Sequence, residues 1–283
     1  MSKATLAALA GHFGRDVDAS IVRIGRAIAQ AKEAEVSLLV LPHAALGGYL
    51  PSLDWRSPHP SHDLPPAIAT DGPEIERLAQ MAGELTLCFG YCEMQGDARY
   101  NAAACVSGDG VLGLHRKVHQ PAGERFYYAS GTRLAAFDTP VGKLGMLIDY
   151  DKTFPEAARA LADDGASILA CLSAWPASLT NRAPRLTTDR QSRLFDLYDC
   201  VRAAENQVVL VSSNQTGRYG QLRFLGRAKI VGPGGEILAR TSSKAAMAIA
   251  TLDIEAEIAT ARRVLNHLAE RRPSAYLPKG PCE

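Results

Sequence analysis

Three polar side chains that could carry acid–base chemistry each follow an apolar, strand-like run of the chain. His43 follows LLVLP, Lys117 follows GLHR and Asp149 follows GMLI. Sites in α/β proteins are usually assembled where strands end, so these residues are candidates for moving protons and stabilising negative charge. Taken singly, each also fits a structural role as a cap, a turn residue or a solvated side chain. Their separation in the sequence does not show that they meet.

Alternating helix and strand patterns surround these three residues. Apolar residues recur every three or four positions from Ile21 to Ala34, which predicts a helix capped by Asp16 or Asp18. Further helices are predicted over residues 73–82, 154–164 and 188–205, and strands over residues 37–41, 85–91, 167–172 and 208–213. Glycine-rich turns at 108–110 and 232–235 predict two hairpins, and a Pro-Val-Gly turn at 140–142 separates two more strands.

These elements predict an α/β protein with a mixed sheet. No Ser/Gly-rich linker divides the chain, so we expect one domain over residues 1–278, followed by a short tail at 279–283. The 283 residues are enough to bury a substantial core, and the composition, 47% hydrophobic and 22% charged, excludes a disordered or collagen-like protein.

Charge and hydropathy limit the expected partners. The net charge of +1 gives no overall field that would attract nucleic acid or an anionic membrane. No apolar run reaches the roughly 20 residues of a membrane span, and the N-terminus lacks the features of a signal peptide. Six scattered cysteines without a CxxC pair are expected to be buried, reduced thiols. We therefore expect a cytoplasmic protein that acts on a small molecule.

A metal or cofactor site is not expected. His115 and His119 are four residues apart and could chelate zinc on a helix, but they follow a strand and run into Pro121, which favours a loop. The GPGG at 232–235 is a turn, because no helix with Lys-Ser/Thr follows it, and there is no dinucleotide fingerprint.

Five ordered motifs resemble those of the nitrilase superfamily of carbon–nitrogen hydrolases: LLVLPHAALGGY, HRKVHQPAGERFYYASG, GMLIDYDKTFPEAAR, RAAENQVVLVSSNQTG and RRPSAY. The resemblance covers nearly the whole chain, from the first strand to Tyr276. It implies a four-layer αββα sandwich that usually assembles through its outer helices into homodimers or larger homo-oligomers.

The resemblance also implies a catalytic Glu, Lys and Cys, in which the thiol attacks a nitrile or amide carbon. Here the glutamate position falls on His43 and the cysteine position on Asp149, whereas the lysine is retained as Lys117. A further family glutamate is retained as Glu124. Ordinary thiol chemistry is therefore not expected, since no other cysteine lies in a matching motif. Cys171 is the nearest alternative, but it lies in the apolar run ILACL and is expected in the core.

Other residues match positions that line the family's substrate pocket. Tyr49 and Trp175 are two of these, and Tyr150 follows the nucleophile position, where its backbone N–H would help Lys117 hold an oxyanion. Each could equally serve packing. Glu124 is expected to orient Lys117 or the substrate; the structural alternative is a salt bridge to Arg116 or Arg125.

Two functions remain open. In the first, Asp149 orients His43 and raises its basicity near neutral pH, and Lys117 stabilises an oxyanion or enolate on a small carbonyl, imine or amide metabolite. Hydration, elimination, isomerisation or cyclisation would suit this set. In the second, the chain is a catalytically inactive pseudoenzyme that binds a metabolite or a protein. Engineered inactivation is disfavoured, because it would usually change the cysteine alone.

Overall fold

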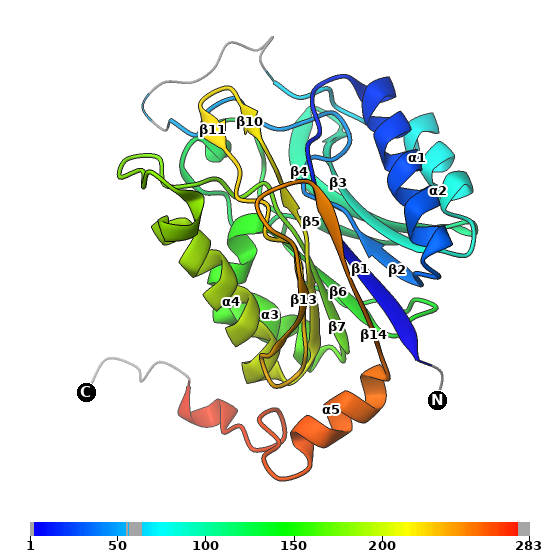
Figure 1. The fold of residues 1–283 in the computed structure, drawn as a ribbon, viewed down its shortest axis with the longest axis vertical. Helices are drawn as coiled ribbons and strands as arrows, with labels where there is room; N and C mark the ends of the chain where they lie inside the picture. The colour runs from blue at the N-terminus through cyan, green and yellow to red at the C-terminus, as the bar shows by residue number, and fades with distance from the viewer. Residues whose placement is uncertain (1–2, 55, 57–63, 277–283) are drawn as a thin grey trace.

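The protein is described from a computed structural model that covers residues 3–54, 56 and 64–276. Two sheets lie face to face, and a pair of helices covers the outer face of each sheet (Figure 1). The predicted four-layer αββα sandwich is therefore confirmed. The predicted tail at 279–283 and Cys282 lie outside the described residues.

The first sheet runs in the order β14–β1–β2–β3–β4–β5, and a short strand, β9, also pairs with β1. Its inner strands β1, β2 and β3 are parallel, whereas β14, β4 and β5 pair antiparallel, so the sheet is mixed as predicted. The strands are β1 (Ala4–Gly11), β2 (Leu38–Val40), β3 (Thr86–Gln95), β4 (Ala98–Ser107), β5 (Gly110–Arg116), β9 (Asn214–Gln215) and β14 (Ala246–Leu252).

The second sheet runs in the order β13–β12–β8–β7–β6, with β6, β7 and β8 parallel. A separate two-stranded hairpin, β10–β11, stands beyond the sheets. These strands are β6 (Leu144–Ile148), β7 (Ile168–Leu172), β8 (Val209–Ser212), β10 (Arg218–Tyr219), β11 (Leu222–Arg223), β12 (Lys229–Val231) and β13 (Ile237–Arg240).

The helices form where sequence signals and burial agree. Asp16 accepts a hydrogen bond from the Ala19 N–H at the start of α1, as the capping pattern predicts. Helices α1 and α2 cover the first sheet and α3 and α4 cover the second, whereas α5 follows β14 at one end of the molecule (Figure 1). The helices are α1 (Val17–Glu33), α2 (Pro73–Ala82), α3 (Pro155–Asp163), α4 (Arg190–Asn206) and α5 (Ile254–Arg262), and the short 3-10 helices are η2 (Ala122–Phe126), η3 (Asp149–Thr153), η4 (Leu186–Thr188) and η5 (Pro273–Ala275).

The core between the sheets consists of small and branched apolar side chains. Leu6, Val40, Ile148 and Val211 are fully buried there. Sequence analysis missed β1, because ATLAALAG has a helix-like composition. It is nevertheless a strand, since it lies between β14 and β2 and buries alternate side chains against both neighbouring layers.

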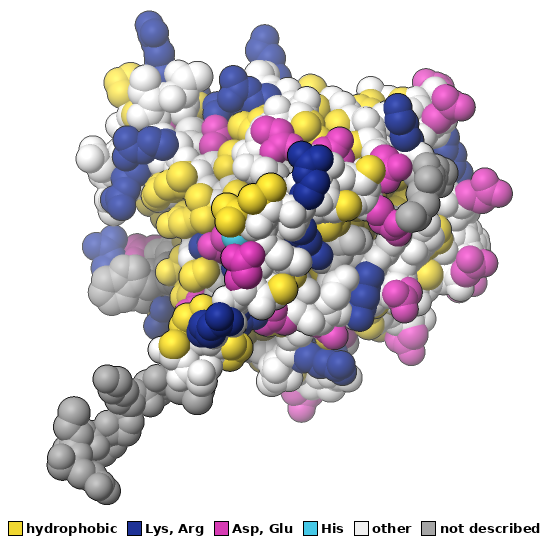
Figure 2. Space-filling view, turned by 90° about the horizontal axis from the view of Figure 1, so that it is seen from below, with side chains coloured by type: hydrophobic (Ala, Val, Ile, Leu, Met, Phe, Trp, Pro, Cys, Tyr) yellow, Lys and Arg dark blue, Asp and Glu magenta, His cyan; other side chains and the backbone are white. Residues whose placement is uncertain are grey.

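The surface at the α5 end carries mixed charge. Figure 2 views this end and shows Lys and Arg side chains scattered among Asp and Glu, with hydrophobic side chains between them. This face presents no field of a single sign. No helix in the described ranges has the length and apolar character needed to cross a bilayer.

Candidate active site

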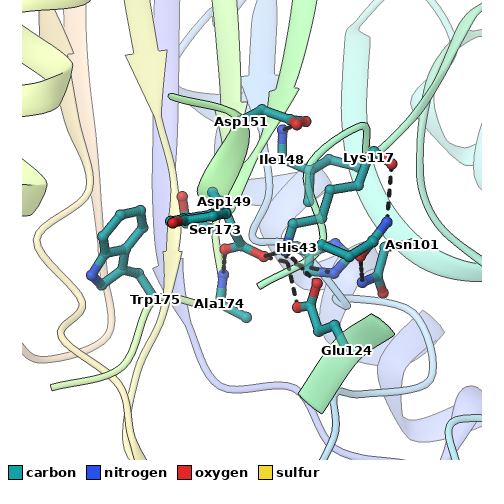
Figure 3. Close-up of polar contacts among 12 residues, drawn as sticks. His43, Asn101, Lys117, Glu124, Ile148, Asp149, Asp151, Ser173, Ala174 and Trp175 are labelled. Carbon is teal, nitrogen blue, oxygen red and sulfur yellow. Dashed lines mark hydrogen bonds and ion pairs between the residues drawn. The ribbon is translucent and has the colours of Figure 1, made fainter. Parts of the chain in front are cut away.

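Lys117 directly follows β5, and its ammonium group is buried between two carboxylates. Its Nζ lies 2.7 and 2.9 Å from the two carboxylate oxygens of Glu124 and 3.3 Å from Oδ2 of Asp149 (Figure 3). Backbone hydrogen bonds to Asn101 and from Gly131 hold the residue in place. An ammonium group has three hydrogens, so the three carboxylate contacts use its full donor capacity.

Burial and neighbouring charges shift the pKa values of Lys117, Glu124 and Tyr49. Burial alone would lower the pKa of Lys117, but the charges of Glu124 and Asp149 outweigh it and raise that pKa. Burial raises the pKa of Glu124, and Lys117 offsets only part of this effect. Burial and the Glu124 charge also raise the pKa of Tyr49 well above its usual value, so Tyr49 is a neutral phenol that donates its hydroxyl hydrogen to Glu124.

Asp149 opens η3 at the end of β6, with its backbone in the left-handed region at φ 43°. This conformation is uncommon for residues other than glycine, and it is often found where a side chain is held for function. One carboxylate oxygen, Oδ1, accepts a hydrogen bond from the Ala174 N–H, while Oδ2 faces Lys117 and His43. Figure 3 shows Asp149 between these two sets of partners.

His43 lies behind the Asp149 carboxylate. Its Nε2 is 3.8 Å from Oδ2 of Asp149, and the side chain is only 1% exposed. Neither ring nitrogen makes a well-formed hydrogen bond within the described residues, although the Asn101 side chain lies close enough to favour the protonated ring. The structure thus brings His43, Lys117 and Asp149 together.

The expected basicity of His43 is wrong. Burial lowers its pKa from 6.5 to about 4; Asp149 acts in the opposite direction but does not compensate, and Lys117 adds to the lowering. His43 is therefore a neutral imidazole at pH 7, and it is not poised to change its charge there.

Gly90 explains how a histidine fits at this place. A methyl group on Gly90 of β3 would lie 2.7 Å from both Cα and Nδ1 of His43. Contacts this short essentially do not occur, so the absence of a side chain at Gly90 lets the ring pack against the strand.

Asp151 is a buried carboxylate beside the candidate site that the sequence did not single out. It is fully buried and accepts hydrogen bonds from the backbone N–H groups of Ile148, Val118 and His119, and from the rings of His115 and His119. The carboxylate therefore ties the segment that carries Lys117 to the segment that carries Asp149. The only sequence feature that could have pointed to Asp151 is its position as a second acidic residue, two residues after Asp149.

His115 and His119, the pair considered above as a zinc site, both form hydrogen bonds with the Asp151 carboxylate. His119 lies in a loop, as the sequence favoured, whereas His115 lies within β5 itself, and each ring lies 2.9 Å from an oxygen of Asp151. Over the described ranges, no group of three or more His, Cys, Asp and Glu residues is arranged to hold a metal ion.

A cavity of about 180 Å³ opens onto part of this cluster. Its walls include five of the predicted site residues: Tyr49, Lys117, Asp149, Tyr150 and Trp175. The other two, His43 and Glu124, lie behind the wall and do not line the cavity. Substrate in this cavity would therefore meet the ammonium group and the Asp149 carboxylate first.

Trp175 is firmly positioned at the cavity wall. Its backbone N–H donates to Asn214 and its indole N–H donates to Gln191, while the ring packs edge-on against Phe195. Tyr150, by contrast, is 37% exposed and packs against Phe154. The apolar wall is thus fixed on the Trp175 side.

The described cysteines are free thiols, and none lines the cavity. Cys88, Cys92, Cys105 and Cys171 are buried, and Cys200 is partly exposed. Burial raises the pKa of Cys171 to about 12, so this residue offers no thiolate at neutral pH.

Comparison with known proteins places the chain in a family. The carbon-nitrogen hydrolase family model matches residues 5–262, and the chain belongs to that family. A probable nitrilase from Schizosaccharomyces pombe is 30% identical over 74% of this chain and 75% of the relative. An N-carbamoylputrescine amidase from Solanum lycopersicum is 28% identical over 96% of this chain and 93% of the relative. The crystal structure of a carbon-nitrogen hydrolase from Helicobacter pylori has a TM-score of 0.81 and 26% identity, covering 97% of both chains.

Proposed function

We propose that this carbon–nitrogen hydrolase homologue is an enzyme that works without a thiol nucleophile, because its Cys and Glu positions are taken by Asp149 and His43. It acts by proton transfer on a small metabolite that contains a carbonyl, imine or amide group. The names of the relatives, a nitrilase and an amidase, favour such a substrate. The observation that carries the proposal is the contact between the Lys117 ammonium and the Asp149 carboxylate at a cavity wall.

Asp149 is the proposed base. Its Oδ2 takes a proton from water or from a carbon next to the reacting group, while Oδ1 stays bonded to the Ala174 N–H. The substrate oxygen or nitrogen that gains negative charge takes the place of Asp149 as the third partner of Lys117. In hydration, the water oxygen bonds to the substrate carbon, and the proton held by Asp149 then passes to the substrate heteroatom.

Glu124 and His43 are proposed as positioning residues in this scheme. Glu124 holds two hydrogens of Lys117, which directs the third toward Asp149 at the cavity wall. His43, neutral at pH 7, fills the space behind Asp149 and places no further positive charge beside its carboxylate. The Tyr49 hydroxyl completes the set by donating to Glu124.

Replacing Asp149 with asparagine tests the proposal, because it removes the base but keeps an oxygen for Ala174. Purified wild-type protein and Asp149→Asn are each incubated with a cell metabolite extract, and mass changes are followed by untargeted mass spectrometry. We expect wild type to convert at least one metabolite, and Asp149→Asn to be slower by a factor of about 10² to 10⁴. His43→Ala should also lose turnover.

Asp97→Asn is the matched control, since Asp97 is exposed in the β3–β4 turn, and it should react like wild type. Equal conversion by wild type and Asp149→Asn would rule out the proposed base.

The double substitution His43→Glu with Asp149→Cys tests whether the cavity descends from that of a thiol amidase. Ammonia release from simple amides by this variant, and not by wild type, would mean that the cavity still admits such substrates.

A second candidate function is a binding pseudoenzyme. It is favoured by the saturation of Lys117, whose three hydrogens all face carboxylate oxygens, leaving none free for an oxyanion. In that case wild type would convert no metabolite, and Asp149→Asn would leave the biological role unchanged.

We also propose that the chain forms a homodimer or a larger homo-oligomer through its outer helices. Leu197 and Val201 lie one turn apart on α4 and are 52% and 38% exposed, which gives this helix an apolar outward stripe. Sedimentation velocity should report an oligomer for wild type and a smaller species for Leu197→Asp; a monomeric wild type would contradict this.

A reducing, cytoplasmic location is proposed from the free thiols.

A further inference from the structure

The β10–β11 hairpin places two arginines directly opposite each other. Arg218 and Arg223 are paired across the two strands, so their side chains leave the hairpin on the same face. Like charges in this position are destabilising. No carboxylate within the described residues forms a salt bridge with either guanidinium group.

The same two arginines line a cavity of about 390 Å³, together with Arg182. One acid, Asp189, also lines it, but its carboxylate is occupied. It accepts hydrogen bonds from Ser178, through both backbone and hydroxyl, and from the backbone of Gln191 and Ala183. Three arginines therefore line this cavity beside one carboxylate that is already bonded elsewhere, and Arg182 also donates a hydrogen bond to the Gln221 carbonyl.

The backbone of the hairpin is held in place, because it is docked on the segment that follows Tyr49. The Gln221 N–H donates to the Pro51 carbonyl, and Leu222 is 1% exposed. A methyl group on Gly220 would lie 2.3 Å from the same carbonyl, which shows how closely the two backbones approach.

This arginine cavity adjoins the cavity of the candidate active site. Ala177 and Leu179 line both. Leu179 also lines a third cavity of about 300 Å³, where Arg182 appears again beside Arg56. A molecule that extends from Lys117 and Asp149 past Leu179 would therefore reach the arginines.

We propose that Arg182, Arg218 and Arg223 bind an anionic group, a carboxylate or a phosphate, at the end of the substrate remote from the reacting atoms. Guanidinium groups suit both anions, because they present paired N–H donors. A bound anion would also neutralise the opposed charges of Arg218 and Arg223. The anion site stands on the hairpin and its cavity; its assignment to the substrate rests on the proposed function.

Anion binding by the full chain tests the site. Glutarate and inorganic phosphate are titrated by calorimetry, with the neutral diamide glutaramide as the uncharged comparison. We expect one of the anions to bind and glutaramide not to bind. Arg218→Gln and Arg223→Gln should each raise the dissociation constant by about tenfold or more. The anion that binds more tightly distinguishes a carboxylate site from a phosphate site.

Thermal unfolding without anion adds a readout with the opposite sign. Arg218→Gln and Arg223→Gln should unfold at a higher temperature than wild type, because each removes a repulsion, yet both should lose the stabilisation that the anion gives wild type. Arg26→Gln is the matched control, since Arg26 is exposed on α1, and it should change neither property.

Three outcomes would overturn the anion site: neither anion binds wild type, glutaramide binds as tightly as glutarate, or the hairpin variants bind like wild type. Failure of the proposed function looks different, because the anions would still bind in an arginine-dependent way while Asp149→Asn left metabolite conversion unchanged. Equal conversion of anionic and neutral substrates by active wild type would remove the link between the two cavities.

Discussion

Replacing Lys117 with methionine is expected to lower the free energy of unfolding by about 3–5 kcal/mol at pH 7. Lys117 is fully buried, and its removal leaves two buried carboxylates, Glu124 and Asp149, without their counter-charge. Methionine has a similar length, so the loss reports the charge and not a cavity. The measurement is equilibrium denaturation by urea.

The same variant should recover stability as the pH falls. Burial already raises the pKa of Glu124 in the wild-type protein, and without Lys117 that pKa must rise further. A carboxyl group whose folded-state pKa exceeds its unfolded value binds the extra proton in the folded state. Stability therefore increases as pH falls through the interval between those two values. Denaturation at pH 5 should show a smaller deficit than denaturation at pH 7.

Lys244→Met is the control for this experiment, because Lys244 is exposed and should tolerate the change within about 0.5 kcal/mol. A deficit for Lys117→Met that is equally small would contradict the buried ion cluster. A large deficit that does not vary with pH would instead point to packing as its cause.

Replacing Asp151 with asparagine should destabilise the protein by about 3 kcal/mol or more, and it should also loosen the candidate site. Asparagine keeps the shape but presents an amide N–H₂ to donors that now face a carboxylate oxygen. Either the His115 ring or the His119 ring with its backbone N–H then loses its acceptor. Because these bonds hold the segment that carries Lys117, metabolite conversion should fall as well.

The deficit of Asp151→Asn also shrinks in acid, but in a lower pH range than the deficit of Lys117→Met. Burial acts to raise the pKa of Asp151, but hydrogen bonds from His115 and His119 outweigh it and hold that pKa well below 3.8. A depressed pKa gives stability that is fully present above the unfolded value and is lost only as pH falls toward the folded value. The gap between wild type and Asp151→Asn should thus stay constant from pH 7 to pH 5 and narrow only in stronger acid.

Asp138→Asn, at an exposed position, is the control and should be nearly neutral. A loss below about 1 kcal/mol for Asp151→Asn would mean that its five hydrogen bonds contribute little beyond what water provides in the unfolded chain.

Local signals in the sequence predicted most of the elements, but the strand expected before the turn at 140–142 is reduced to an isolated β-bridge at Phe137. The Asp16 cap and the apolar stripe place α1, and Pro73 marks the first residue of α2. The β1 strand was missed because its alanine and leucine content favours a helix locally, whereas its position between two strands is decided by distant residues such as those of β14. Tertiary pairing overrode local propensity there.

The sequence predicted which side chains would meet at the candidate site, but it did not predict their pKa values. Motif positions correctly brought His43, Lys117 and Asp149 together. The basicity of His43 was wrong because charges can be counted in a sequence, whereas the extent of burial cannot. Asp151 was missed for a related reason: its side-chain partners in β5 and the following loop lie more than 30 residues away along the chain.

The left-handed backbone conformation at Asp149 limits which residue types can occupy this position in the cavity wall. Aspartate and asparagine occupy this conformation at lower cost than most residues, whereas branched side chains are strongly disfavoured there. Few residue types can therefore replace one another at this position. The carboxylate of aspartate is one of the few reactive groups that this backbone conformation tolerates without a change in the turn.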